Sequence, residues 1–251
     1  TWWVTEAIPI PAASLLPAVL LPLLGVCKAS VAAKYYSHHL ILLLLGGFLL
    51  ARAVECSGLH RRIALATLTT VGSSPRRLAF GFLITSAMLS MWISNTATTL
   101  MLMPIAISVA IRTEKSGQVS GGVFTTCLLL CTAYGANVGG IGTLIGTPPN
   151  LIFTKNAEDL DPPVLIDFLH WLPFGMPLVL IFVPIIGFLM TRFLLPLPAG
   201  SSRDGMDSLL EERKSLGKMS SAEARVLGVF ICTALLWITR GGTGLPGWGG
   251  L

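Results

Sequence analysis

The chain has 251 residues, of which 53% are hydrophobic and only 12% are charged. An average soluble domain carries about 25% charged residues, so this composition excludes a soluble globular protein and indicates an integral membrane protein. The net charge of +5 is compatible with a nucleic acid partner in a soluble protein, but here its distribution along the chain fits membrane topology better. We expect no nucleic acid partner.

Four uninterrupted apolar runs are long enough for membrane-spanning helices, each of which needs about 20 residues. Between the second and the third run lie two further apolar stretches that polar residues or glycines interrupt. In chain order the six stretches are 8–27, 38–57, 79–111 (interrupted), 123–153 (interrupted), 172–195 and 225–240. They predict an all-α polytopic membrane protein. The chain starts at Thr1 without a cleavable signal segment and stops abruptly at Leu251, so we expect a fragment of a longer protein.

Basic residues predict which ends of these helices face the cytoplasm. Thirteen of the seventeen Lys and Arg residues lie in three segments, which the positive-inside rule places in the cytoplasm. The three segments are 52–77, 112–115 and 192–225. The stretch 79–111 lies between two of them, so it must enter the membrane from the cytoplasm and return to it. The charges therefore favour a re-entrant hairpin at 79–111 over a membrane-spanning helix.

The tip of this hairpin falls near a polar triplet, Ser94-Asn95-Thr96. Lipid offers no partner to unpaired backbone groups, so a helix interrupted at membrane depth must face protein, a cavity or an ion. The next stretch, 123–153, must then cross outward as a single element. Its segment 135–150 holds five glycines and two prolines, and each glycine costs a helix about 1 kcal/mol relative to alanine. We expect a helix that unwinds partway and restarts.

A hairpin tip beside a broken helix is typical of a transporter binding site near the middle of the membrane. Helix N-termini suit carboxylate or phosphate groups, whereas unwound carbonyls and hydroxyls suit an alkali cation. Neither 79–111 nor 123–153 contains a charged residue, and a cage of neutral oxygens favours Na⁺ over a divalent ion. The alternative interpretation is that these small and polar residues only pack or hydrogen-bond between helices.

The residues of both interrupted stretches resemble a known family. The run Ser94-Asn95-Thr96-Ala97-Thr98-Thr99, together with Gly146-Thr147-Pro148-Pro149-Asn150, is similar to the paired site motifs in the N-terminal half of the divalent anion/sodium symporter family. This family includes the sodium-coupled dicarboxylate and citrate transporters. Segments 3–9, 45–48 and 59–65 also agree with the family in order and spacing. The likeness extends over nearly the whole chain.

This resemblance implies one half of an inverted-repeat, elevator-type transporter that forms a homodimer when full length. Residues 1–78 would supply scaffold helices and a cytoplasmic arm helix near 58–71. Residues 79–195 would form half of the transport domain, with the re-entrant hairpin, the broken helix and the following helix. Residues 196–224 would be a cytoplasmic connection, and 225–251 would start the next scaffold helix. The family's second repeat has no counterpart in this sequence.

The resemblance also implies the residues of the site. The sodium ligands would be Ser90, Ser94, Asn95 and Gly146. The substrate carboxylate would be bound by Ser94, Asn95, Thr96 and Thr147. The implied function is sodium-coupled symport of a di- or tricarboxylate such as succinate, malate or citrate, with Na⁺ as the co-transported ion. The implied location is a plasma membrane or a bacterial inner membrane.

The residues leave three alternatives open. A transporter of sulfate or another divalent anion would use the same kind of site, and a truncated, non-transporting subunit would pack against a full-length protein. A membrane-embedded hydrolase would need a base beside a nucleophile such as Ser90 or Ser94. Neither 79–111 nor 123–153 contains a histidine or a lysine, so we expect a transporter and not an enzyme.

Overall fold

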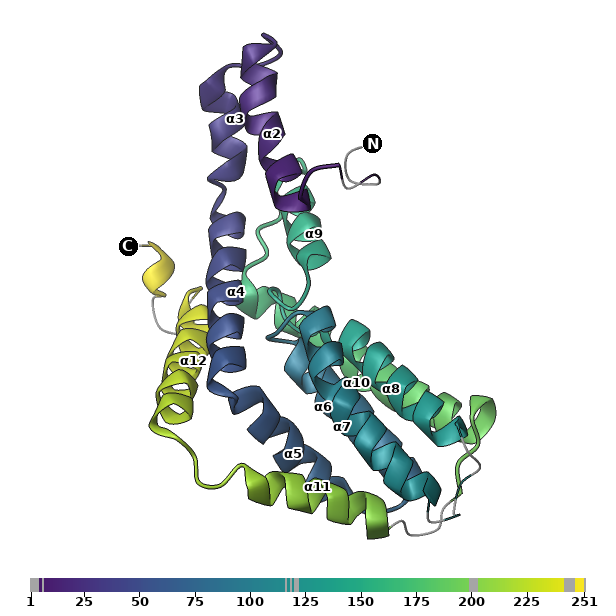
Figure 1. Ribbon diagram of the computed structural model, residues 1–251. Helices are drawn as coiled ribbons and strands as arrows, with labels where there is room; N and C mark the ends of the chain where they lie inside the picture. Colours follow the sequence, from purple (N-terminus) through teal and green to yellow (C-terminus); the bar gives the residue numbers. More distant parts are fainter. Residues whose placement is uncertain are drawn as a thin grey trace. The chain divides into compact units, whose positions relative to one another are not determined.

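The computed structural model describes residues 5, 7–115, 117, 119, 122–198, 203–241 and 247–250, and the regular structure in this part of the chain is helical. Figure 1 shows the helices, coloured along the chain. They are α2 (Ile10–Leu23), α3 (Ala29–Tyr36), α4 (His39–Ser57), α5 (Leu59–Val71), α6 (Pro75–Ser90), α7 (Asn95–Lys115), α8 (Val123–Gly139), α9 (Pro148–Glu158), α10 (Phe168–Leu189), α11 (Arg203–Ser215) and α12 (Ser221–Thr239). A π-helical turn, Met190–Leu194, extends α10, and a 3-10 turn, Trp248–Gly250, follows α12.

Four of these helices are long and apolar enough to cross a membrane, namely α4, α7, α10 with its π-helical extension, and α12. They confirm the prediction of a multi-pass integral membrane protein. The bounds of α4 agree closely with the apolar run at 38–57, whereas α12 begins at Ser221, before the run predicted at 225–240. Helix α10 starts earlier than the predicted 172, because the Asp167 carboxylate caps it by accepting the backbone N–H of His170 at 2.9 Å.

The chain divides into two compact units, residues 1–46 and 47–251. In the first unit α2 packs against α3. The prediction of one long span at 8–27 is wrong in its length, because α2 has 14 residues and a bilayer needs about 20. The chain leaves the helix after α2 through Gly25, whose φ of 70° is a conformation that glycine adopts at little steric cost.

The core of the second unit lies where α6, α7 and α8 pack together. Its fully buried large side chains include Phe82, Leu83, Leu102, Phe124 and Leu128. Helices α6 and α8 approach closely because α8 carries glycines at the contact. A Cβ added at Gly139 would lie 2.2 Å from the Ala87 carbonyl oxygen, and one at Gly135 would lie 2.4 Å from that of Leu83. Small residues let helix backbones meet in this way in membranes, where association depends on packing.

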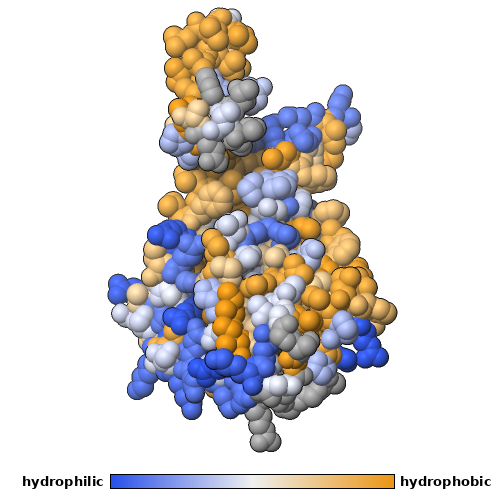
Figure 2. All heavy atoms as spheres, turned by 45° about the vertical axis from the view of Figure 1, so that its right-hand side comes forward, coloured by the Kyte–Doolittle hydropathy of each residue, from blue (hydrophilic) through white to orange (hydrophobic). Residues whose placement is uncertain are grey.

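Ion pairs join α5 to α11 and α12 at a hydrophilic end of the second unit. Arg62 of α5 binds the Glu223 carboxylate through two N–H groups, at 2.9 and 3.1 Å, and also donates to the carbonyl oxygens of 216–218. Arg61 pairs with Glu212 of α11 at 2.7 Å. Figure 2 shows hydrophilic residues gathered at the end where α11 lies. The helix predicted near 58–71 is therefore present as α5, and most of the predicted connection folds onto it.

We expect Gly139→Ala to destabilise the fold. The added Cβ would meet the Ala87 backbone, so α6 and α8 would have to move apart, and overpacking of this kind costs about 1–3 kcal/mol. The midpoint of thermal unfolding in detergent should therefore fall. Gly228→Ala in α12 is the matched control, since nothing lies within 4 Å of a Cβ added there, and its midpoint should stay the same or rise. Equal midpoints for the two variants would contradict the close α6–α8 contact.

Candidate functional site

The hairpin of α6 and α7 places the polar triplet at the start of a helix. Helix α6 ends at Ser90 and α7 begins at Asn95, so a short turn joins them. Ser94 is the N-cap of α7, because its hydroxyl accepts the backbone N–H of Ala97 at 3.3 Å. Asn95 and Thr96 follow as the first helical residues, whose N–H groups have no acceptor within the helix. The triplet therefore presents backbone donors and the positive end of the α7 dipole.

The hairpin tip meets the broken helix through Asn95. The Ser90 hydroxyl donates to the Asn95 side-chain oxygen at 2.7 Å, and the Asn95 amide nitrogen donates to the Asn137 side-chain oxygen at 3.4 Å. The Gly140 backbone lies directly against Asn95, since a Cβ added at Gly140 would be 2.6 Å from the Asn95 Oδ1. Ser90 is fully buried and Asn95 is half-buried. These four residues, which we call the Asn95 cluster, join the end of α6 to the end of α8.

The break itself occupies residues 140–147, between the end of α8 and the start of α9, as the sequence predicts. Asn150, in the first turn of α9, closes it. Its side-chain nitrogen donates to the carbonyl oxygens of Gly140 and Thr143, each at 2.8 Å, and only 6% of the residue is exposed. The sequence prediction gave Asn150 no role. An asparagine one turn after a glycine-rich break is the signal that could have identified it.

Two further hydrogen bonds fix the break to its neighbours. The Thr143 hydroxyl donates to the Met91 carbonyl oxygen, which lies at the hairpin tip. The Trp171 indole N–H of α10 donates to the Ile141 carbonyl oxygen at 2.8 Å. Backbone carbonyls at the break and at the hairpin tip thus bind donors from other elements, which keeps both irregular segments in a defined conformation.

The residues predicted to bind sodium gather around the Asn95 cluster. Ser90 and Asn95 are hydrogen-bonded to each other, and Ser94 precedes Asn95 as the helix cap. Gly146 is buried against Gly140, since a Cβ added at Gly146 would lie 2.5 Å from the Gly140 carbonyl oxygen. Hydroxyl, amide and backbone oxygens therefore come close together from the hairpin and from the break, with no charged side chain among them.

The residues predicted to bind a carboxylate lie at the starts of two helices. Ser94 and Thr96 are exposed at the start of α7, and Thr147 is half-buried at the start of α9. Within the described residues, Thr147 makes no hydrogen bond to the hairpin. It is the N-cap of α9 and is followed by Pro148 and Pro149, which have no backbone N–H. The start of α7 therefore offers more backbone N–H donors for an anion than the start of α9, which contributes the Thr147 hydroxyl and a helix dipole.

Comparison with known proteins places these features in a family context. The sequence profile of the citrate transporter family matches residues 1–244. A sodium-dependent dicarboxylate transporter of Staphylococcus saprophyticus is 38% identical over 245 residues, which are 96% of this chain and 47% of that protein. One of Staphylococcus aureus strain USA300 is 37% identical over 246 residues, with the same two coverages. The chain spans about half the length of the curated relatives it matches.

We expect Asn150→Ala to destabilise the break. The change removes the side-chain donor from the Gly140 carbonyl oxygen and one of two donors from that of Thr143, which keeps the Gly146 N–H. An unpaired buried polar group costs about 1–3 kcal/mol. Thermal unfolding in detergent should show a clearly lower midpoint. Asn156→Ala is the control, because Asn156 is exposed on the same helix, and its midpoint should match that of the unchanged chain. If Asn150→Ala unfolds no earlier than Asn156→Ala, Asn150 does not hold the break.

Proposed function

Because the chain belongs to the citrate transporter family, we propose that it supplies one half of a sodium-coupled symporter for di- or tricarboxylates such as succinate, malate or citrate. The observation that carries this proposal is the Asn95 cluster, where the hairpin tip and the broken helix bring neutral oxygens and a helix N-terminus to one place. Two relatives named as sodium-dependent dicarboxylate transporters support both the ion and the substrate class.

Sodium would bind among oxygens of Ser90, Ser94, Asn95 and Gly146. In the structure the Ser90 hydroxyl donates to the Asn95 side-chain oxygen at 2.7 Å, so these two oxygens already lie next to each other. A bound cation would accept lone pairs from both, with the Ser90 proton turned away. The neutral ligands suit Na⁺, since a divalent ion usually recruits carboxylates. The break supports sodium binding because its backbone makes fewer helical hydrogen bonds and places carbonyl oxygens near Asn95.

One carboxylate of the substrate would bind at the start of α7, to Ser94, Asn95 and Thr96, with Thr147 from the start of α9. The first N–H groups of α7 and its dipole suit a negative group. Sodium bound beside Asn95 would add a full positive charge at the same place. Ion and anion would then bind cooperatively, because each lowers the electrostatic cost of binding the other.

The movement would be of the elevator type, with α6 to α10 travelling as a block. Close α6–α8 contact through Gly135 and Gly139 supports motion as one body. In this proposal α6 and α7 form a hairpin that enters from the cytoplasm, 1–78 and 225–251 belong to the scaffold, and 196–224 is the cytoplasmic connection. The full-length protein would be a homodimer. Ser90 donates to an amide oxygen and not to a base, which favours a transporter over the hydrolase alternative.

We expect sodium-dependent uptake that requires Asn95. Proteoliposomes should contain this chain, alone or joined to the remaining half of the Staphylococcus saprophyticus relative, and should be offered radiolabelled succinate, malate, citrate and sulfate with Na⁺ or K⁺. Asn95→Ala removes the side chain that links hairpin and break, so uptake should fall at least about tenfold, a loss of about 1.4 kcal/mol or more. Asn156→Ala should transport normally. Uptake indifferent to both sodium and Asn95 would refute the proposal, and preferred uptake of sulfate would favour the divalent-anion alternative.

We expect Gly140→Ala to weaken sodium binding. The added Cβ would lie 2.6 Å from the Asn95 Oδ1, so it would displace the proposed ligand. A ligand that binds only the folded state raises the unfolding midpoint, so replacing K⁺ by Na⁺ at constant ionic strength should stabilise the unchanged chain. This rise should be lost in Gly140→Ala and kept in Gly46→Ala, where an added Cβ meets nothing within 4 Å. An equal rise in both variants would argue against sodium at Asn95.

A further inference from the structure

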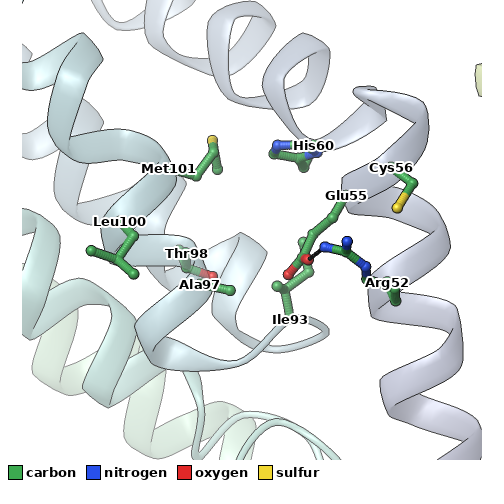
Figure 3. A pocket seen from close by; sticks show the side chains of 9 residues that line it. All are labelled: Arg52, Glu55, Cys56, His60, Ile93, Ala97, Thr98, Leu100 and Met101. Atoms are coloured by element: carbon green, nitrogen blue, oxygen red, sulfur yellow. Dashed lines mark hydrogen bonds and ion pairs between the residues drawn. The ribbon is translucent and has the colours of Figure 1, made fainter.

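A cavity of about 470 Å³ opens between the end of α4, the start of α5 and the first turns of α7 (Figure 3). This volume falls within the range of small-molecule sites, about 300–1,000 Å³. Its lining residues are Arg52, Glu55, Cys56, His60, Ile93, Ala97, Thr98, Leu100 and Met101. None of them is among the residues assigned above to sodium or to the carboxylate.

The cavity borders the proposed carboxylate site through one face of α7. Residues three and four apart share a helix face, so Ser94 lies on the same stripe as Ala97, Thr98 and Met101, which form part of the cavity wall. Ser94 is exposed. The Thr98 hydroxyl is buried and has no hydrogen-bond partner among the described residues, so a polar group without a protein partner lies in this wall.

The charged residues of the wall are Arg52 and Glu55, which lie one turn apart on α4. A guanidinium N–H of Arg52 donates to the Glu55 carboxylate at 3.1 Å, and the Arg52 side chain is 73% exposed whereas that of Glu55 is 27% exposed. Figure 3 shows the two side chains meeting on the side of α4 that faces the start of α7. Arginine carries five N–H donors, so this pair orients Arg52 and leaves most of its donors available.

A dicarboxylate carries two negative charges, and the proposed site has no positively charged side chain. The residues assigned to it are neutral, and its compensation would come from a helix dipole and from sodium. Resting on the proposed function, we propose that this cavity is the route by which the substrate reaches the start of α7, and that Arg52 recognises its carboxylate there. Guanidinium groups bind carboxylates through two parallel hydrogen bonds, and Glu55 would hold Arg52 in position for them.

Cys56 offers a direct test, because it is exposed and lines the cavity. The chain would be placed in lipid nanodiscs with Cys27→Ser and Cys232→Ser, so that Cys56 is the accessible thiol and Cys127 and Cys131 stay buried. The rates of modification by a negatively charged methanethiosulfonate (MTSES) and by a positively charged one (MTSET) would be measured. Arg52→Gln should lower the ratio of the MTSES rate to the MTSET rate by about three- to tenfold, because the variant lacks one positive charge near Cys56.

Matched variants distinguish an effect of the Arg52 charge at the cavity from the loss of an arginine elsewhere on the surface. Arg52→Lys should keep the ratio, and Glu55→Gln should raise it, since the carboxylate opposes Arg52. Arg77→Gln is the control for loss of an arginine, because Arg77 is exposed and does not line the cavity, and it should leave the ratio unchanged. A ratio that is equal in Arg52→Gln and in the unchanged chain would overturn the proposal.

Substrate protection supplies the second measurement. Succinate with Na⁺ should slow MTSES modification of Cys56 at least threefold in the unchanged chain and in Arg52→Lys, but not in Arg52→Gln. Protection that survives Arg52→Gln undiminished would overturn the role of Arg52. Labelling of Cys56 requires no transport, so sodium-coupled symport and carboxylate capture by Arg52 can be refuted independently. Uptake indifferent to sodium refutes symport, whereas sodium-dependent uptake with an unchanged KM for succinate in Arg52→Gln refutes only the capture by Arg52.

Discussion

Backbone carbonyls inside a membrane need donors from the protein, and the arrangement of the second unit depends on meeting this need. In the break after α8, the backbone carbonyls of Gly140, Ile141 and Thr143 lie outside a helix, and lipid would supply them no donor. Asn150 of α9 and Trp171 of α10 provide the missing donors. The break is therefore stable only when elements that follow it in the chain have folded over it.

The same bonds explain why the hairpin tip and the break keep a fixed geometry. Thr143 of the break donates to the tip at Met91, and Ser90 and Asn95 lie against Gly140. Away from the hairpin tip, Gly139 and Gly135 of α8 let the α6 backbone come close. Helices α6 and α8 are therefore in contact from the tip along their length. In the proposed function, such a site would bind charge with backbone dipoles and neutral oxygens, and it would avoid the cost of burying a permanently ionised side chain in lipid.

Local sequence patterns predicted much of this fold. Apolar runs gave α4 with nearly correct bounds and α12 with a start that was too late, and the glycines of 135–150 gave the break between α8 and α9. The polar triplet was correctly associated with a turn between two helices, although it proved to be the cap and first residues of α7 and not an interruption within a helix. The length of α2 was predicted wrongly, because hydropathy does not register that the chain turns at Gly25.

Contacts between residues far apart in the sequence could not be predicted. The Trp171 indole meets the Ile141 carbonyl oxygen from 30 residues away, and the cavity wall combines residues of α4, α5 and α7. Periodicity and composition describe which face of a helix is apolar, but they carry no information on which other helix covers it.

The Arg62 contacts also have a consequence for how the chain is made. Arg62 and its partner Glu223 are 161 positions apart, so the hairpin, the break and α10 must all leave the ribosome before the arginine can find its carboxylate. During that interval Arg62 lacks its carboxylate partner, although α5 can already pack against α6. Closure of the Arg62 contacts is thus a late event in biogenesis, and it marks the moment at which α12 is held in its final place beside the rest of the chain.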